Sequence, residues 1–89
     1  MVPGDIEPRL RALGLSTTDR LSDAQARWFS EFVDVGEYGL ALECLADWLS
    51  DELLPVSAAE RSEAESLATL MCNVDQVMEP LQRCPPMSA

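Results

Sequence analysis

Residues 36–49 read GEYGLALECLADWL, and the spacing of their apolar side chains predicts a helix over residues 37–54. At 100° per residue, six of these side chains fall within a wedge of roughly 100°. Ala41, Cys44 and Trp48 form a second apolar strip beside the wedge. A helix that is apolar over more than half of its circumference packs against several neighbours, so we expect it at the centre of the fold. The wedge consists of Tyr38, Leu42, Leu45, Ala46, Leu49 and Leu53.

Two shorter helices are predicted before this central one. The first covers residues 6–15 and is expected to end at Gly14, since glycine is common just after the last turn of a helix. The second covers residues 23–35, because Ser22 and Gln25 have the spacing of a capping box. We expect its bulky apolar side chains to face the core, namely Trp28, Phe29, Phe32 and either Val33 or Val35.

Two more helices are predicted after the central helix, which Pro55 is expected to stop. Ser57 and Glu60 form a second capping-box pair at the start of the next helix. A break near Asn73 separates that helix from a short last one, which can tolerate Pro80. We expect the acids of the first turns to face water, namely Glu60, Glu63 and Glu65, and an apolar stripe to be buried, namely Leu67, Leu70, Met71 and Val74.

No segment alternates apolar and polar residues with period two, so the sequence predicts an all-α protein. Its 89 residues are expected to form a single domain, a compact bundle of four to five short helices, with residues 1–5 and 84–89 as flexible ends. No apolar run is long enough to span a membrane, and the first residues do not resemble a secretory signal. We therefore expect a cytoplasmic protein with reduced cysteines, of which Cys44 and Cys72 lie inside helices and Cys84 in the tail.

The composition argues against catalysis. The chain has no histidine and no lysine, so the commonest general base and the commonest metal ligand are absent. Acids four residues apart on an exposed helix lack the contrasting environments that acid–base catalysis needs. The residues around Asp34 lack the alternating ligands of a calcium-binding loop. We expect no enzymatic activity, no cofactor and no bound metal.

The net charge of -10 is distributed unevenly along the chain. Residues 31–65 contain ten acids and one arginine, whereas the charges of residues 1–30 cancel. A chain of this kind repels nucleic acid and anionic membranes and attracts a basic partner. Acids four residues apart repel each other on a helix, and a basic partner would offset this cost. The alternative interpretation is a solvated face without a partner.

The candidate partner-binding residues lie on the central helix and at its ends. Three acids form a row opposite the leucines, with one acid at each end of the helix. Trp48 is either a core residue or a partly exposed anchor, since tryptophan is enriched at the centre of interfaces. The candidate set is Glu37, Glu43, Asp47, Trp48, Asp51 and Glu52.

Residues 32–71 resemble the MafI-like family of small immunity proteins. The resemblance rests on an aromatic residue, a G-E-Y-x-L-A-L-E-x-L string and a later P-V-S string, here Phe32, residues 36–45 and residues 55–57. It implies a cytosolic antitoxin that binds a cognate secreted toxin domain, often a nuclease, and blocks its active site or substrate groove. Because a nuclease groove is basic, the acidic segment agrees with this implication.

A second hypothesis is a small helical regulatory or adaptor protein. In that case Ala41, Cys44 and Trp48 would form a helix–helix interface between two copies of the chain. The sequence thus leaves open whether the protein is a monomer or a weak homodimer.

Overall fold

The computed structural model of this chain describes residues 5–87, so the flexibility expected of residues 1–4 and 88–89 concerns positions outside the described range. The fold is all-α, as predicted, and the described range contains no strand. No helix in this range is long and apolar enough to cross a membrane. The elements are α1 (Ile6–Thr17), a 3₁₀ turn η1 (Thr18–Arg20), α2 (Asp23–Asp34), α3 (Tyr38–Asp51), α4 (Ala58–Met71) and α5 (Val74–Leu81).

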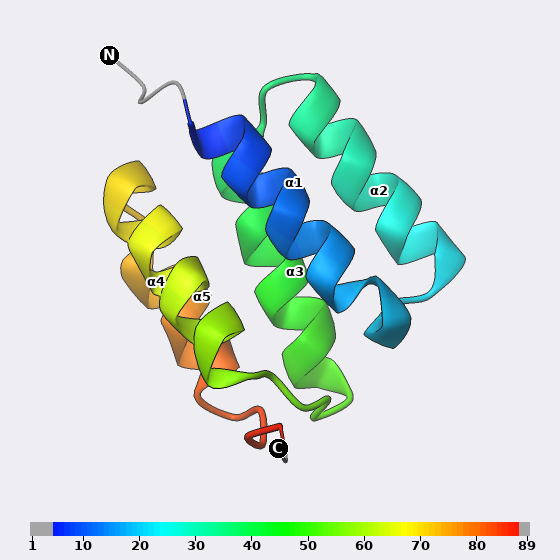
Figure 1. The fold of residues 1–89 in the computed structure, drawn as a ribbon, viewed down its shortest axis with the longest axis vertical. Helices are drawn as coiled ribbons and strands as arrows, with labels where there is room; N and C mark the ends of the chain where they lie inside the picture. Colours follow the sequence, from blue (N-terminus) through cyan, green and yellow to red (C-terminus); the bar gives the residue numbers. More distant parts are fainter. Residues whose placement is uncertain (1–4, 88–89) are drawn as a thin grey trace.

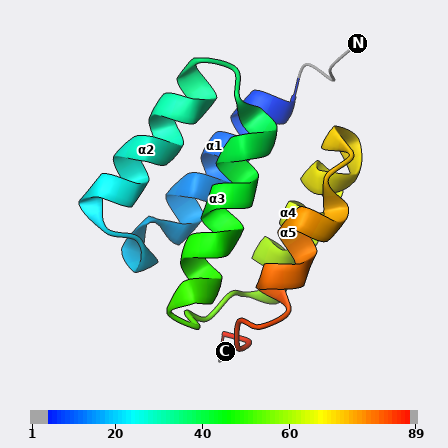
Figure 2. The same cartoon turned by 180° about the vertical axis from the view of Figure 1, so that it is seen from behind.

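Helix α3 lies at the centre of the bundle, as the sequence predicts. It contacts the other four helices, with α1 and α2 on one side and α4 and α5 on the other (Figure 1, Figure 2). Leu42, Leu45 and Leu49 of α3 are buried at the middle of the core. Because burying a leucine side chain contributes about 2 kcal/mol, this row is a main source of the packing energy.

Three of the helices end with the same backbone motif. In each, a residue just past the helix takes a positive φ, and two N–H groups reach back to carbonyls of the last turn. Gly36 has this position after α2, Leu53 after α3 and Cys72 after α4, with φ values of 82°, 51° and 61°. Helix α3 therefore ends at Asp51, and not at residue 54 as predicted, because the chain leaves the helix before it reaches Pro55.

Gly14 does not end α1, contrary to the prediction, since the helix continues to Thr17. A Cβ atom at position 14 would lie 2.4 Å from Cε2 of Phe29. Only glycine therefore lets the Phe29 ring of α2 pack directly on the backbone of α1. The glycine at this position serves close packing between two helices.

The buried face of α2 is narrower than predicted. Phe29 and Val33 are buried, whereas Val35 is exposed. Trp28 was also expected in the core, but its exposed fraction is 54%, and its ring centroid lies 5.8 Å from that of Phe32. Helix α2 is at the edge of the bundle and packs mainly against α1 and α3, so part of its apolar surface stays in contact with solvent.

The cysteines and one leucine also depart from the expected burial. Cys72, expected inside a helix, is exposed because it follows the end of α4, and Cys44 is half-buried. Cys84, placed in a flexible tail by the sequence, is buried. Leu70 of the predicted buried stripe is exposed, while Leu67 is buried. The three thiols are free in the described structure.

The segment after α5 is held against the body of the protein. The N–H of Val56 donates to the carbonyl of Pro85 over 3.0 Å, and the N–H of Met87 donates to the carbonyl of Val56 over 3.2 Å. Arg61 of α4 donates to the carbonyls of Leu81 and Cys84. Residues 84–87 are thus fixed by hydrogen bonds, in contrast to the loose tail expected from the sequence.

Candidate functional site

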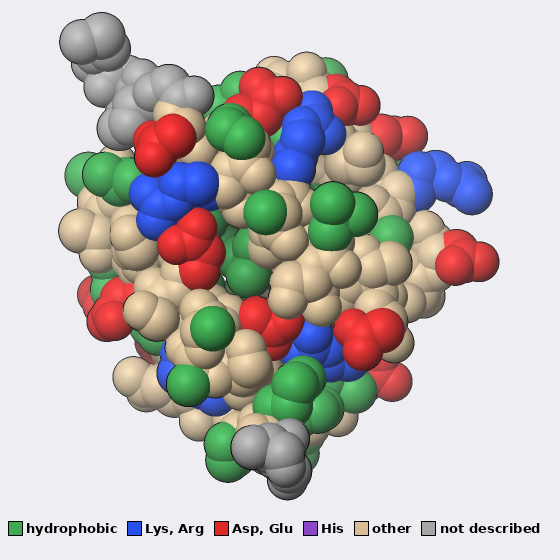
Figure 3. Space-filling view, viewed as in Figure 1, with side chains coloured by type: hydrophobic (Ala, Val, Ile, Leu, Met, Phe, Trp, Pro, Cys, Tyr) green, Lys and Arg blue, Asp and Glu red, His purple; other side chains and the backbone are tan. Residues whose placement is uncertain are grey.

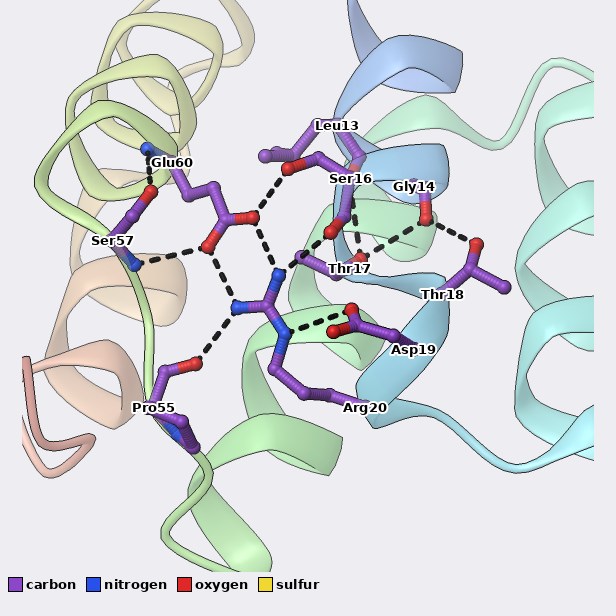
Figure 4. A network of polar contacts seen from close by, with 10 residues as sticks. All are labelled: Leu13, Gly14, Ser16, Thr17, Thr18, Asp19, Arg20, Pro55, Ser57 and Glu60. Atoms are coloured by element: carbon purple, nitrogen blue, oxygen red, sulfur yellow. Dashed lines mark hydrogen bonds and ion pairs between the residues drawn. The ribbon is translucent and has the colours of Figure 1, made fainter. Parts of the chain in front are cut away.

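Arg20 and Glu60 form a nearly buried ion pair that joins the η1 turn to α4 (Figure 4). Two hydrogen bonds of 2.7 and 2.6 Å link the guanidinium to the carboxylate. The guanidinium also donates to the carbonyls of Ser16 and Pro55, and the Ser16 hydroxyl donates to the carboxylate. Glu60 was expected to face water, but its side chain is only 8% exposed. This acid is a structural partner of an arginine 40 residues away in the sequence.

These contacts stabilise the ionised form of Glu60. The hydrogen bond from Arg20 lowers its pKa most, burial acts in the opposite direction, and hydrogen bonds from Ser16 and from the backbone of Ser57 lower it further. The result is a pKa of about 2, against an ordinary value of 4.5. Glu60 therefore stays charged at neutral pH.

Arg9 and Arg11 of α1 make similar pairs across helices. Arg9 donates two hydrogen bonds of 2.9 and 2.7 Å to Glu63 of α4. Arg11 binds Asp34 at the end of α2 over 2.7 Å and Glu7 over 3.0 Å. Basic and acidic side chains accordingly lie next to one another on the face seen in Figure 3. With the Arg20 pair, these contacts neutralise three acids of the acidic middle segment.

The five acids that the sequence predicts as partner-binding residues differ from these paired acids. None of them forms an ion pair within residues 5–87. Three of them, Glu43, Asp47 and Asp51, occur four residues apart on α3, and we call these three the acidic row. Among the described residues, Glu43 alone of the three accepts a side-chain hydrogen bond, from Asn73 Nδ2 over 3.0 Å.

The environment of Asp47, the middle acid of the row, disfavours negative charge. Partial burial raises the pKa of Asp47 above its ordinary value, and the charges of Asp51 and Glu43 raise it further, against a smaller opposite effect of Arg83. The ionised row is therefore a local source of repulsion within the protein. A positive charge brought close to it would relieve that repulsion.

Helix α5 adds two acids beside the row, Asp75 and Glu79, which are not among the candidate residues predicted from the sequence. Helices α3 and α5 lie side by side at the front of Figure 2, and a hollow of about 290 Å³ opens between them. Asp75 and Glu79 line it from α5, and Glu79 makes a long ion pair of 3.8 Å with Arg83. The spacing of Asp75 and Glu79 was visible in the sequence, but the C-terminal third has a net charge of only -1, which concealed them. The lining residues are Glu43, Asp47, Asp75, Gln76, Glu79, Pro80 and Arg83.

The other candidate residues lie around this row and not within one compact site. Helix α3 has 14 residues and is about 21 Å long, and Glu37 and Glu52 flank its two ends. The two end acids cannot contact one small group, although a protein surface can span both. Trp48 is half-buried and packs against the core, so its role as a core residue or as a partly exposed anchor stays a prediction.

Two further observations limit what the surface can bind. Within residues 5–87, no three side chains of His, Cys, Asp or Glu come close enough together to hold a metal ion. A second hollow, of about 370 Å³, lies between α1 and α2 and is mainly apolar, with Leu15, Leu21 and Phe29 in its lining. The hollow beside the acidic row has four acids and one arginine in its lining, so its lining carries a net negative charge.

Comparison with protein-family models, with curated proteins and with solved structures gives no match for this chain. The resemblance of residues 32–71 to MafI-like immunity proteins therefore stays a prediction from the sequence.

Proposed function

We propose that this protein is an immunity protein that binds and neutralises a cognate secreted toxin domain in the cytoplasm. The observation that carries the proposal is the acidic row, Glu43, Asp47 and Asp51, which has no arginine partner among the described residues. Arg9, Arg11 and Arg20 neutralise acids elsewhere, yet the fold keeps three like charges on successive turns of α3. Such a row is unfavourable for the isolated protein and favourable in contact with a basic partner. The resemblance to MafI-like proteins supports the same function.

A nuclease is the class of toxin that suits this surface best. The groove of a nuclease is lined by basic side chains because it holds phosphates. Carboxylates spaced about 6 Å apart along α3 would take the place of the phosphates. A lysine or arginine of the groove would enter the hollow and pair with Asp75 and Glu79. Inhibition would follow from occupation of the groove, with no catalytic step and no cofactor.

The proposal is tested by co-expressing the chain with the product of the neighbouring gene. Cell survival reports protection, and titration calorimetry of the purified pair reports affinity. One variant neutralises the acidic row, and a control variant removes the same number of charges from exposed acids on α2 and α4. The row variant is Glu43→Gln/Asp47→Asn/Asp51→Asn, and the control variant is Asp23→Asn/Glu31→Gln/Glu65→Gln.

We expect the row variant to lose at least about a hundredfold in affinity and the control variant less than about tenfold. The difference between the two losses in affinity measures the contribution of the acidic row itself, because both variants have the same net charge. If the wild-type chain gives no protection and does not bind even at low salt, the proposal is wrong. Equal losses in the two variants would contradict the assignment of binding to the acidic row.

The alternative function is a helical adaptor that forms a homodimer through the strip of Ala41, Cys44 and Trp48. Ala41 is buried and Trp48 is half-buried against the core, so this strip offers little free apolar area to a second copy. A stable interface usually needs about 800 Å² from each partner. Sedimentation separates the two functions, because the adaptor predicts a concentration-dependent dimer that persists in high salt.

A further inference from the structure

Leu53 has a backbone conformation that favours glycine. At the end of α3 its N–H donates to the carbonyl of Ser50 over 3.0 Å, and the N–H of Leu54 donates to the carbonyl of Leu49 over 2.9 Å. This motif places Leu53 in the left-handed region with a φ of 51°. Gly36 has the equivalent position after α2, where the absence of a Cβ removes the strain. A leucine is less favourable there because its Cβ crowds the neighbouring carbonyl.

The side chain of Leu53 contributes little to the core in return. Its exposed fraction is 58%. Within residues 5–87, it is not one of the side chains that form the core or pack against the core. The next residue, Leu54, does pack against the core. Strain in the backbone and an apolar side chain in water are both unfavourable for folding. Stability therefore does not explain a leucine at this position.

Leu53 and Met87 are exposed apolar side chains at one end of the molecule, which we call the apolar end and which borders the acidic row. The hydrogen bonds between Val56 and the C-terminal segment bring exposed Met87 to the same end as the turn after α3 (Figure 1). Hydrophobic side chains gather at this end, at the bottom of Figure 3. Asp51 and Glu52 directly precede Leu53, and both are exposed and without an ion pair in the described range. The apolar end thus continues the acidic surface of α3.

We infer that Leu53 is the apolar anchor of the partner-binding surface, and that it inserts into an apolar pocket beside the basic groove of the toxin domain. This inference rests on the proposed function and adds a second kind of contact to it. The acidic row supplies attraction that salt screens. A buried leucine supplies affinity that salt does not screen. Interfaces commonly concentrate their affinity in a few such apolar anchors with polar residues around them.

Cys72 provides a matched control for Leu53. It has the same left-handed conformation, with a φ of 61°, and is also exposed. It follows the far end of α4, a helix of about 21 Å that starts near the apolar end (Figure 1). Substitution of either residue by glycine relieves the strain, but only L53G removes the side chain that is inferred to be the anchor.

The test uses the product of the neighbouring gene as the probe and compares L53G, L53N and C72G with the wild-type chain. We expect L53G and C72G each to raise Tm by about 4 °C or more. We expect L53G and L53N to weaken binding about tenfold or more, and the loss to persist in about 0.5 M NaCl. C72G should bind as the wild type does.

Each other result overturns the inference in a recognisable way. A lower Tm for L53G would show that the leucine serves the fold. Unchanged affinity of L53G, for a toxin domain that the wild type binds, would remove the anchor and leave the proposed function intact. An equal loss of affinity in C72G would show that the change in backbone strain weakens binding, and not the loss of the Leu53 side chain. If the wild-type chain does not bind the probe, the proposed function fails and the anchor fails with it.

Discussion

Glu60 on α4 and Asp47 on α3 are two carboxylates that the same fold treats in opposite ways. Glu60 is nearly buried, is bound to Arg20 and has its pKa lowered to about 2. Asp47 is exposed, lies between two other acids and has its pKa raised. The ionised form of Glu60 therefore stabilises the fold, whereas the ionised form of Asp47 destabilises it. The position of an acid relative to the arginines, and not the local charge of the sequence, separates the structural acids from the candidate binding acids.

The largest effect is expected when the structural pair is broken at Arg20. In Arg20→Met the carboxylate of Glu60 stays buried without a countercharge, which costs about 3–5 kcal/mol. This is a large part of the stability of a small domain, so urea unfolding should show a much lower midpoint. Arg27→Met is the control, because Arg27 is exposed and has no ion pair within residues 5–87. Similar losses in the two variants would contradict a structural role of the pair.

Low pH should remove the contribution of the Arg20–Glu60 pair to the stability of the fold without a mutation. The folded pKa of Glu60, about 2, lies below the ordinary 4.5, so its contribution is complete above pH 4.5 and is lost as the pH falls towards 2. The pKa difference corresponds to about 3 kcal/mol. The stability difference between the wild type and Glu60→Gln should therefore shrink between about pH 5 and pH 2. A difference that stays constant over this range would contradict the assigned pKa.

The sequence predicted those features that depend on neighbours along the chain. Both capping boxes, at Ser22 and Ser57, are present, and α3 is central because its apolar wedge is wide. The end of α3 was predicted wrongly because the motif that stops it has Leu53, and not glycine, in the left-handed position. Gly14 was misread as a helix end because its role depends on the Phe29 ring of another helix.

The charged surface could be predicted only in part, since ion pairs depend on contacts between distant segments. The acidic row was visible from the spacing of its acids on one helix. The pairing of Arg20 with Glu60 and of Arg9 with Glu63 joins residues 40 and 54 positions apart, so local patterns do not show it. The contribution of α5 to the row likewise depends on how α5 packs against α3.

Smaller changes in the free energy of unfolding are expected when single acids are neutralised. Their sign should differ between an acid without an ion pair, Asp47, and a paired acid, Glu63. Asp47→Asn removes repulsion with Glu43 and Asp51, so we expect the free energy of unfolding to rise by about 0.5 kcal/mol. Glu63→Gln loses the charge of the ion pair and one of the two hydrogen bonds to Arg9, so we expect a decrease of about 0.5–1 kcal/mol. Thermal unfolding at low salt measures both changes. If Asp47→Asn lowers the stability, the carboxylate has a structural role and the contrast with Glu63 is wrong.

The smallest effect is expected from salt. Added NaCl screens repulsion between exposed acids, whereas the nearly buried pair of Arg20 and Glu60 is screened much less. Stability should therefore rise by a few tenths of a kcal/mol, on the order of one like-charge pair, between about 0.05 and 0.5 M NaCl. The rise should be smaller in the row variant than in the control variant, although both have the same net charge. Equal rises would mean that the repulsion is spread over the whole surface, and the acidic row would then lose its distinction from the other exposed acids.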